Sequence, residues 1–144
     1  MIDRYTLPFW KNLWSDSSKF ETYLKVEKAS LEALYQRGVI DAKTNEKLQR
    51  ASFNLEDINR LERILKHDVL AFVDACRLSL GEEKRWFHFG LTSSDVIDTA
   101  HSLLFKEANR QIHQAIQQLK TTLQQLALTH QHTPIRSEEH TSEL

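Results

Sequence analysis

The sequence predicts an all-α protein, and three observations support that prediction. Apolar residues recur at steps of three and four over most of the chain, which is the spacing of one face of an α-helix. The 144 residues include only three glycines and two prolines, so few breaks are expected. No segment alternates apolar and polar residues as a half-buried strand does. The chain is therefore expected to form long helices joined by short connections.

Capping residues and helical spacing locate the elements in order. Residues 1–15 are expected to form an irregular arm, which is rich in aromatic side chains and should pack against the rest of the protein. Asp16 or Ser17 can cap the first helix, Asp41 the second and Asn54 the third. Four helices are thus expected before the last one, over residues 16–38, 41–51, 54–65 and 69–80.

A final, much longer helix is expected from Ser94 to about His130. At 1.5 Å per residue it would be about 55 Å long, whereas a compact domain of this chain length has a radius of gyration of about 15 Å. We expect it to protrude and its apolar stripe to need partner helices, so the protein forms an oligomer, the chain is a fragment, or both. The stripe follows Ile97 at a mean step of about 3.6: Ala100, Leu104, Ala108, Ile112, Ala115, Leu119, Leu123 and Leu126.

Composition argues against several classes of protein. With a formal net charge of −1, the chain has no electrostatic reason to bind nucleic acid or an acidic membrane surface. Cys76 is the single cysteine, which excludes a disulfide framework and a thiolate metal cage. No apolar run approaches the roughly 20 residues that span a bilayer, and the N-terminus lacks a signal-peptide pattern. We expect a cytoplasmic protein.

A glycine-hinged loop runs into the long helix with the sequence WFHFGLTSSDVIDT, residues 86–99. Thr92 and Asp95 have the spacing of a capping box. Such a helix start leaves backbone N–H groups free at the positive end of the helix dipole, where a carboxylate or phosphate can bind. The alternative is that these residues only cap the helix.

Three motifs keep a characteristic order and spacing: MIDRY at residues 1–5, KHDV at 66–69 and HFGLTSSDVIDTA at 88–100. Together they resemble the adenylosuccinate lyase family of the fumarase/aspartase superfamily, over residues 1 to about 135. The resemblance implies an L-aspartase-like, all-helical homotetramer built on a central bundle, with no metal or organic cofactor. It implies β-elimination of fumarate in purine nucleotide biosynthesis, from adenylosuccinate to give AMP and from the succinylated aminoimidazole carboxamide ribotide.

The resemblance also implies roles for residues near the two ends of the pattern. Arg4 matches a nucleotide contact and suits a phosphate, while Tyr5 can donate a hydroxyl hydrogen bond. Thr92 and Ser93 match the residues expected to bind a succinyl carboxylate. The alternative for Arg4 is a solvated terminal residue.

The tripeptide Lys66-His67-Asp68 matches a substrate-binding segment that usually reads Arg-His-Asp. Lys66 supplies a point charge in place of a bidentate guanidinium. His67, next to Asp68, can be held in one tautomer and fits a catalytic role beside the leaving group. The alternative is that the His-Asp pair only caps a helix.

Other polar and aromatic features are expected to be structural. The aromatic residues of the segment 86–89 should pack in the core, and His88 within it is assigned no catalytic role. The pair Glu27-Lys28 is expected to lie on a solvated helix face.

The expected organisation is an N-terminal helical domain over residues 1–93, the first long helix of the bundle over 94–135, and a non-native tail over 136–144. That tail resembles the translation of a common sequencing adapter; the alternative is a genuine polar terminus. The family's catalytic histidine segment and its serine-bearing loop have no match here, so the fragment is expected to be inactive alone.

Two other interpretations remain open. One is a different lyase of the superfamily, such as argininosuccinate lyase or a cycloisomerase, against which the Arg4-Tyr5 and Lys66-His67-Asp68 motifs argue. The other is a non-catalytic helical scaffold that associates through the long helix.

Overall fold

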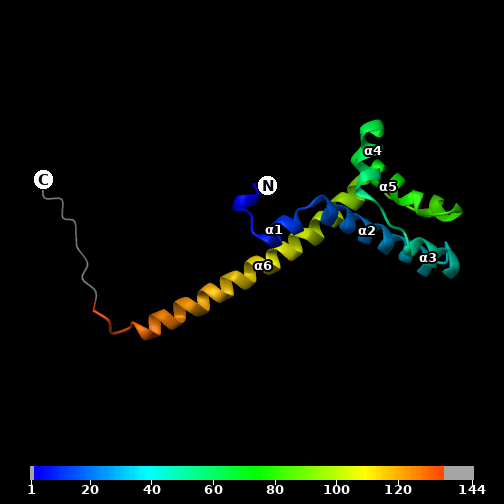
Figure 1. Ribbon diagram of the computed structural model, residues 1–144. Helices are drawn as coiled ribbons and strands as arrows, with labels where there is room; N and C mark the ends of the chain where they lie inside the picture. Colours follow the sequence, from blue (N-terminus) through cyan, green and yellow to red (C-terminus); the bar gives the residue numbers. More distant parts are fainter. Residues whose placement is uncertain (1, 135–144) are drawn as a thin grey trace, which may run out of the picture. The chain divides into compact units, whose positions relative to one another are not determined.

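The computed structural model describes residues 2–134, and every regular element in this part of the chain is helical (Figure 1). The all-α prediction is confirmed. The 136–144 segment assigned as a tail lies outside the described residues. In chain order the elements are η1 (Asp3–Tyr5), α1 (Pro8–Leu13), α2 (Asp16–Gln36), α3 (Ala42–Gln49), α4 (Leu55–Leu65), α5 (Asp68–Leu78), η2 (Glu82–Trp86) and α6 (Ser93–Thr129).

The N-terminal arm is more regular than predicted. Pro8 begins α1, because the fixed φ of proline suits the first helical position and Leu7 before it is extended. The prediction of an irregular arm is therefore wrong for this segment. Its expected packing is confirmed: Leu13 is buried, and the Trp14 ring lies 5.6 Å from the ring of Phe105 on α6.

Side-chain caps set the starts of the middle helices. Asp41 caps α3 and Asn54 caps α4, each by accepting a hydrogen bond from a backbone N–H, as predicted. The cap of α2 is Ser15, whose hydroxyl accepts a backbone N–H, and not Asp16 or Ser17. Those two residues form the first turn of the helix instead.

The core of the first part of the chain is centred on Phe72 of α5, whose side chain is fully buried. Its ring stacks on Phe20 of α2 at 5.7 Å and meets the rings of Tyr23 and Phe53 edge-on at 5.6 and 5.9 Å. The ring of Phe87 lies 6.5 Å away. Aromatic pairs of this geometry add to the free energy gained by burying the rings. The cluster therefore joins the middle of α5 to α2 and to the segment that leads into α6.

Helix α6 is a single α-helix of 37 residues, with both ends within one residue of the prediction. The chain divides into a unit of residues 1–107 and a second unit that begins at Ala108. Within the first unit, Val96, Ala100 and Leu104 of α6 are buried. In the described part of the second unit, four apolar residues of the predicted stripe are about half exposed: Ile112, Leu119, Leu123 and Leu126.

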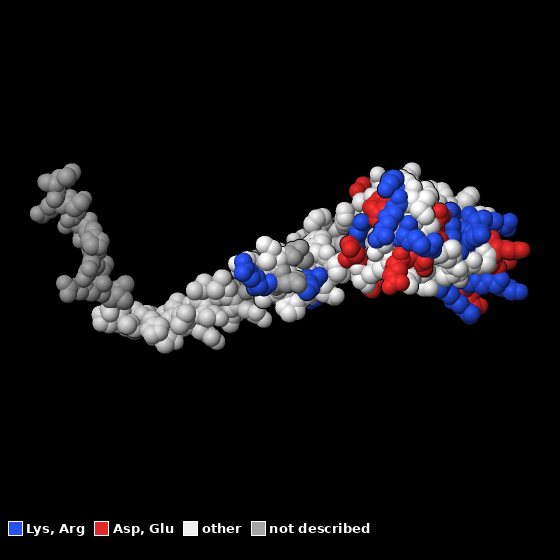
Figure 2. Space-filling view, turned by 45° about the horizontal axis from the view of Figure 1, so that its top comes forward, with Lys and Arg blue, Asp and Glu red and all other residues white. Residues whose placement is uncertain are grey.

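Charged side chains of both signs cover the first unit. Figure 2 shows Lys and Arg interspersed with Asp and Glu over the face in view. Within residues 2–134, no helix is both long enough and apolar enough to cross a membrane.

Candidate functional site

The predicted tripeptide forms the junction between α4 and α5. Lys66 ends α4 in the left-handed conformation, with φ of 55°. His67 caps α5, and its Nδ1 accepts a hydrogen bond from the Leu70 N–H at 3.2 Å. A neutral imidazole that accepts at Nδ1 carries its proton on Nε2. Nε2 of the exposed His67 is thus the nitrogen left for a ligand.

Asp68 serves a different partner from the one expected. Its Oδ1 accepts from the Val69 N–H at 2.8 Å, and its Oδ2 lies 3.3 Å from Nζ of Lys19 on α2. Burial raises the pKa of Asp68, but these hydrogen bonds and the Lys19 charge lower it by more, so the pKa lies below its usual value. The Leu70 amide holds the His67 tautomer. Asp68 instead joins α5 to α2.

The second candidate segment is the helix-start loop, residues 87–92, which leads into α6. Phe87 begins it with a fully buried ring, and its carbonyl accepts a hydrogen bond from Nη2 of Arg77 at 3.0 Å. His88 and Gly90 both have positive φ, 67° and 75°. Glycine adopts this conformation freely, whereas a non-glycine residue there costs about 1–3 kcal/mol.

Glu27 of α2 is the residue that sequence reasoning placed wrongly. It is fully buried, and its Oε1 lies 2.6 Å from Nδ1 of His88. The expectation of a solvated face is therefore wrong. The available signal was helical spacing: Glu27 lies four residues from both Tyr23 and Leu31, which are core residues.

The aromatic residues of the same segment divide between core and surface. Phe87 is buried as predicted, whereas Phe89 is 51% exposed and meets the ring of Trp86 at 5.1 Å. The expectation that Phe89 packs in the core is wrong, because it follows the left-handed turn at His88.

The start of α6 contains one of the two hydrogen bonds of the predicted capping box, the one from the Thr92 backbone to the Asp95 side chain. The Thr92 N–H donates to Oδ2 of Asp95 at 2.7 Å, and α6 begins at the next residue. Thr92 is exposed and Ser93 half-buried. The positive end of a helix of this length favours an anion, although the Asp95 carboxylate already occupies part of it.

Arg4 and Tyr5 lie together on η1. The guanidinium carbon of Arg4 lies 4.7 Å from the centre of the Tyr5 ring, and both side chains are exposed. In the part of the chain that the structure describes, no hydrogen bond or ion pair joins them to the tripeptide or to Thr92 and Ser93.

Helix α2 contacts both the Lys66-His67-Asp68 tripeptide and the helix-start loop. Lys19 binds Asp68 at the start of α5, and Glu27 binds His88 in the helix-start loop. These two points are eight residues apart, which is about 12 Å along a helix. Neither Lys19 nor Glu27 carries a local sequence signal for its partner, which lies 49 or 61 residues away.

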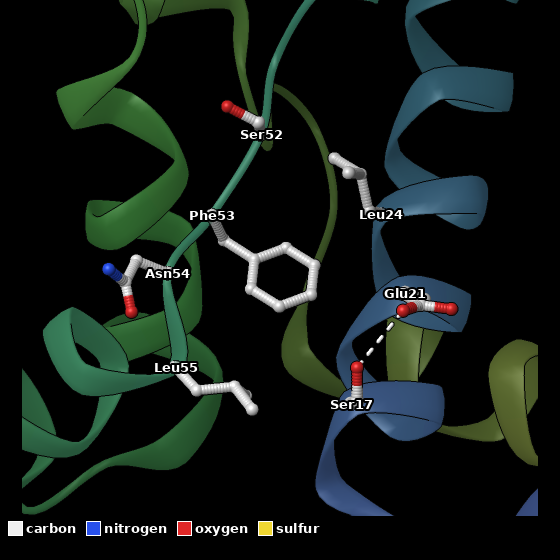
Figure 3. A pocket seen from close by; sticks show the side chains of 7 residues that line it. All are labelled: Ser17, Glu21, Leu24, Ser52, Phe53, Asn54 and Leu55. Carbon is white, nitrogen blue, oxygen red and sulfur yellow. Dashed lines mark hydrogen bonds between the residues drawn. The ribbon is translucent and has the colours of Figure 1, made fainter. Parts of the chain in front are cut away.

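A groove elsewhere in the first unit does not include the predicted residues. It has a volume of about 500 Å³ and lies between α2 and the segment before α4 (Figure 3). The Phe53 ring lies between the two sides, and the Ser17 hydroxyl donates to Glu21 at 3.0 Å. Its remaining lining residues are Leu24, Ser52, Asn54 and Leu55. Among residues 2–134, no three His, Cys, Asp or Glu side chains are grouped to hold a metal ion.

Comparison with known proteins identifies the class to which this helical fold belongs. Residues 4–143 match the lyase family, and the chain belongs to that family. The fold is similar to the crystal structure of fumarate lyase from Mesorhizobium sp. BNC1, with a TM-score of 0.80 over 90% of this chain and 32% of that chain, at 23% identity. This structural likeness supports the fold alone.

The particular relatives are adenylosuccinate lyases, as the motifs predicted. The chain is 46% identical over 134 residues to the enzyme of Helicobacter pylori strain J99, covering 92% of this chain and 30% of the relative. It is 39% identical over 142 residues to that of Bacillus subtilis strain 168, covering 97% and 33%. The chain thus spans about a third of the length of these relatives.

Proposed function

We propose that this chain is the N-terminal part of an adenylosuccinate lyase of purine nucleotide biosynthesis. The whole enzyme would eliminate fumarate from adenylosuccinate, giving AMP, and from the succinylated aminoimidazole carboxamide ribotide. The observation that carries the proposal is the 36–46% identity to adenylosuccinate lyases over nearly all of this chain.

In this proposal the chain supplies substrate contacts. Arg4 binds the nucleotide phosphate, Tyr5 donates a hydroxyl hydrogen bond to the nucleotide, and Thr92 and Ser93 bind a succinyl carboxylate at the start of α6. Lys66, His67 and Asp68 bind the substrate, with His67 beside the leaving group. His67 acts there through Nε2, which its capping bond leaves available.

The reaction explains why these contacts alone do not suffice. Elimination needs a base that removes a proton next to a carboxylate and an acid that protonates the departing nitrogen. It also needs fixed positive groups beside the developing charge. The main acid and base belong to segments that this chain does not match, so the 144-residue chain is proposed to be inactive alone. Acid–base chemistry of this kind requires no metal or organic cofactor.

We further propose that the complete protein is a cytoplasmic homotetramer. Residues 1–93 would form the N-terminal domain and 94–135 the first long helix of the central bundle. The half-exposed apolar residues in the second half of α6 support association through that helix.

A chimera tests the proposed function. Residues 1–134 of this chain replace the matched segment of the H. pylori relative, and adenylosuccinate loss is followed by ultraviolet absorbance. We expect cleavage of adenylosuccinate and of the succinylated ribotide, but not of argininosuccinate. A folded chimera that cleaves neither purine substrate would contradict the proposal and favour a scaffold.

Paired alanine variants test the site within that chimera. Replacing Thr92 and Ser93 by Ala removes two hydrogen bonds to a charged group, so kcat/KM should fall at least about 100-fold. Ser102→Ala is the matched control, because the Ser102 hydroxyl donates to the Asp98 carbonyl on the same helix at 2.8 Å. Equal kcat/KM for the paired variant and the control would contradict the assigned contacts.

A further inference from the structure

Glu27 is a buried carboxylate that the proposed chemistry does not use. Its side chain is only 1% exposed, and its neighbours four residues away on α2, Tyr23 and Leu31, are core residues. Burying a carboxylate is costly unless it is paired, and a well-packed apolar residue of similar volume is often as stable or more so. Core packing by itself therefore does not account for a glutamate here.

The partner of Glu27 is His88 in the helix-start loop. Nδ1 of His88 lies 2.6 Å from Oε1 of Glu27, a short contact of the charge-assisted kind. Oε2 of Glu27 has no hydrogen-bond partner among the described residues. Among the described residues, the carboxylate of Glu27 thus hydrogen-bonds to the helix-start loop through His88.

The loop needs a tether at this position. Upstream, Phe87 is held by its buried ring and by the bond from Arg77. Downstream, the Thr92 N–H is held by Asp95. Between these points the chain reverses through positive φ at His88 and Gly90, a conformation that histidine adopts only at a cost.

We propose that Glu27 is a positioning residue, whose buried carboxylate holds the His88 imidazole and thereby sets the helix-start loop that presents Thr92 and Ser93. The importance of that presentation for binding rests on the proposed function. The anchoring of the loop does not, and it can be measured in the 144-residue chain without any substrate.

The central variant is Glu27→Leu, which removes the acceptor without leaving an unpaired buried charge. Amide hydrogen exchange should accelerate about tenfold or more at Phe89 and Thr92, whose N–H groups donate to the Trp86 carbonyl and to the Asp95 carboxylate, while protection within α2 and α5 stays unchanged. Imidazole ¹⁵N shifts of His88 at pH 8.5 should report a proton on Nδ1 in the parent chain, and a mixture of tautomers in the variant.

Two further variants separate positioning from general stability. Glu27→Gln keeps an acceptor oxygen and should restore most of the loop protection. In a His88→Gly background, where glycine adopts the left-handed conformation freely, Glu27→Leu should change loop exchange by less than about twofold. Glu21→Leu, an exposed position on the same helix, is the matched control and should leave the loop unchanged.

Three results would overturn the inference: loop exchange unchanged in Glu27→Leu, acceleration spread equally over α2 and α5, or the same acceleration in the His88→Gly background. Should Glu27→Leu fail to fold, a Glu27→Gln variant with parent-like loop exchange and tautomer supports the inference, and one with an unanchored loop opposes it. An inactive chimera combined with the expected exchange results would remove the proposed function and leave the anchoring intact.

Discussion

Replacing Phe72 by Ala is expected to destabilise the first unit by about 4 kcal/mol. The ring is fully buried and packs against four other aromatic rings, with centroid distances of 5.6 to 6.5 Å. Buried Phe→Ala substitutions cost about 3–5 kcal/mol, because transfer energy is lost and a cavity remains. Domains of this size are stable by only about 5–15 kcal/mol, so the variant should fold with little margin.

Urea unfolding of the 144-residue chain, followed by far-ultraviolet circular dichroism, measures this cost. With a slope of about 1.3 kcal/mol/M, the midpoint should fall by about 3 M. Phe72→Leu keeps most of the volume and should cost less than about 1.5 kcal/mol. The control is Phe89→Ala, a half-exposed ring with one edge contact, expected to cost about 1 kcal/mol or less. A loss for Phe72→Ala no larger than that for the control would refute the central place of this ring.

The remaining predictions concern pH, reactivity and association. The pKa of Asp68 is lowered from its ordinary 3.8, so the ionised carboxylate stabilises the folded chain above that pH, and this contribution is lost as the pH falls below it. The melting temperature should therefore fall more steeply from pH 5 to 3 for the parent than for Asp68→Asn. Parallel curves of melting temperature against pH would contradict this prediction. Burial, and secondarily the charge of Glu27, raises the pKa of the Cys76 thiol to about 12. A disulfide reagent at pH 8 should therefore react with Cys76 about 1000-fold more slowly than with a thiol of ordinary pKa, and rapidly once urea unfolds the chain. Equal reaction rates with and without urea would contradict the burial of Cys76. In sedimentation the parent chain should associate through the apolar stripe of α6, whereas a variant with both Leu119→Glu and Leu123→Glu should be monomeric. Gln117→Glu changes an exposed polar residue of the same helix and is the control. Unchanged sedimentation of the paired variant would argue against association through the stripe.

Local chemistry accounts for most of the correct predictions about the fold. Helical periodicity identified the middle helices and α6, because each must bury one face and the sequence repeats at that spacing. Asp41 and Asn54 were identified as caps because a short polar side chain before an apolar run satisfies backbone N–H groups within a few residues. The cap of α2 was missed because Ser15, Asp16 and Ser17 are all good capping residues.

The family motifs could be recognised in the sequence, since they are contiguous runs with characteristic spacing. The partial exposure of the apolar stripe of α6 could also be predicted, because a compact domain cannot cover the full length of a helix that is longer than the domain. The sequence by itself thus determined the helical class, the main helix boundaries and the lyase resemblance, all of which depend on neighbours along the chain.

Only the tertiary structure decided which groups hold the candidate segments. Lys19 meets Asp68 across 49 residues, and Glu27 meets His88 across 61. Pairings at such separations depend on how helices pack, and no local pattern encodes them. A glutamate followed by a lysine has the composition of a solvated surface, yet packing buried Glu27 and gave it a partner in the loop before α6.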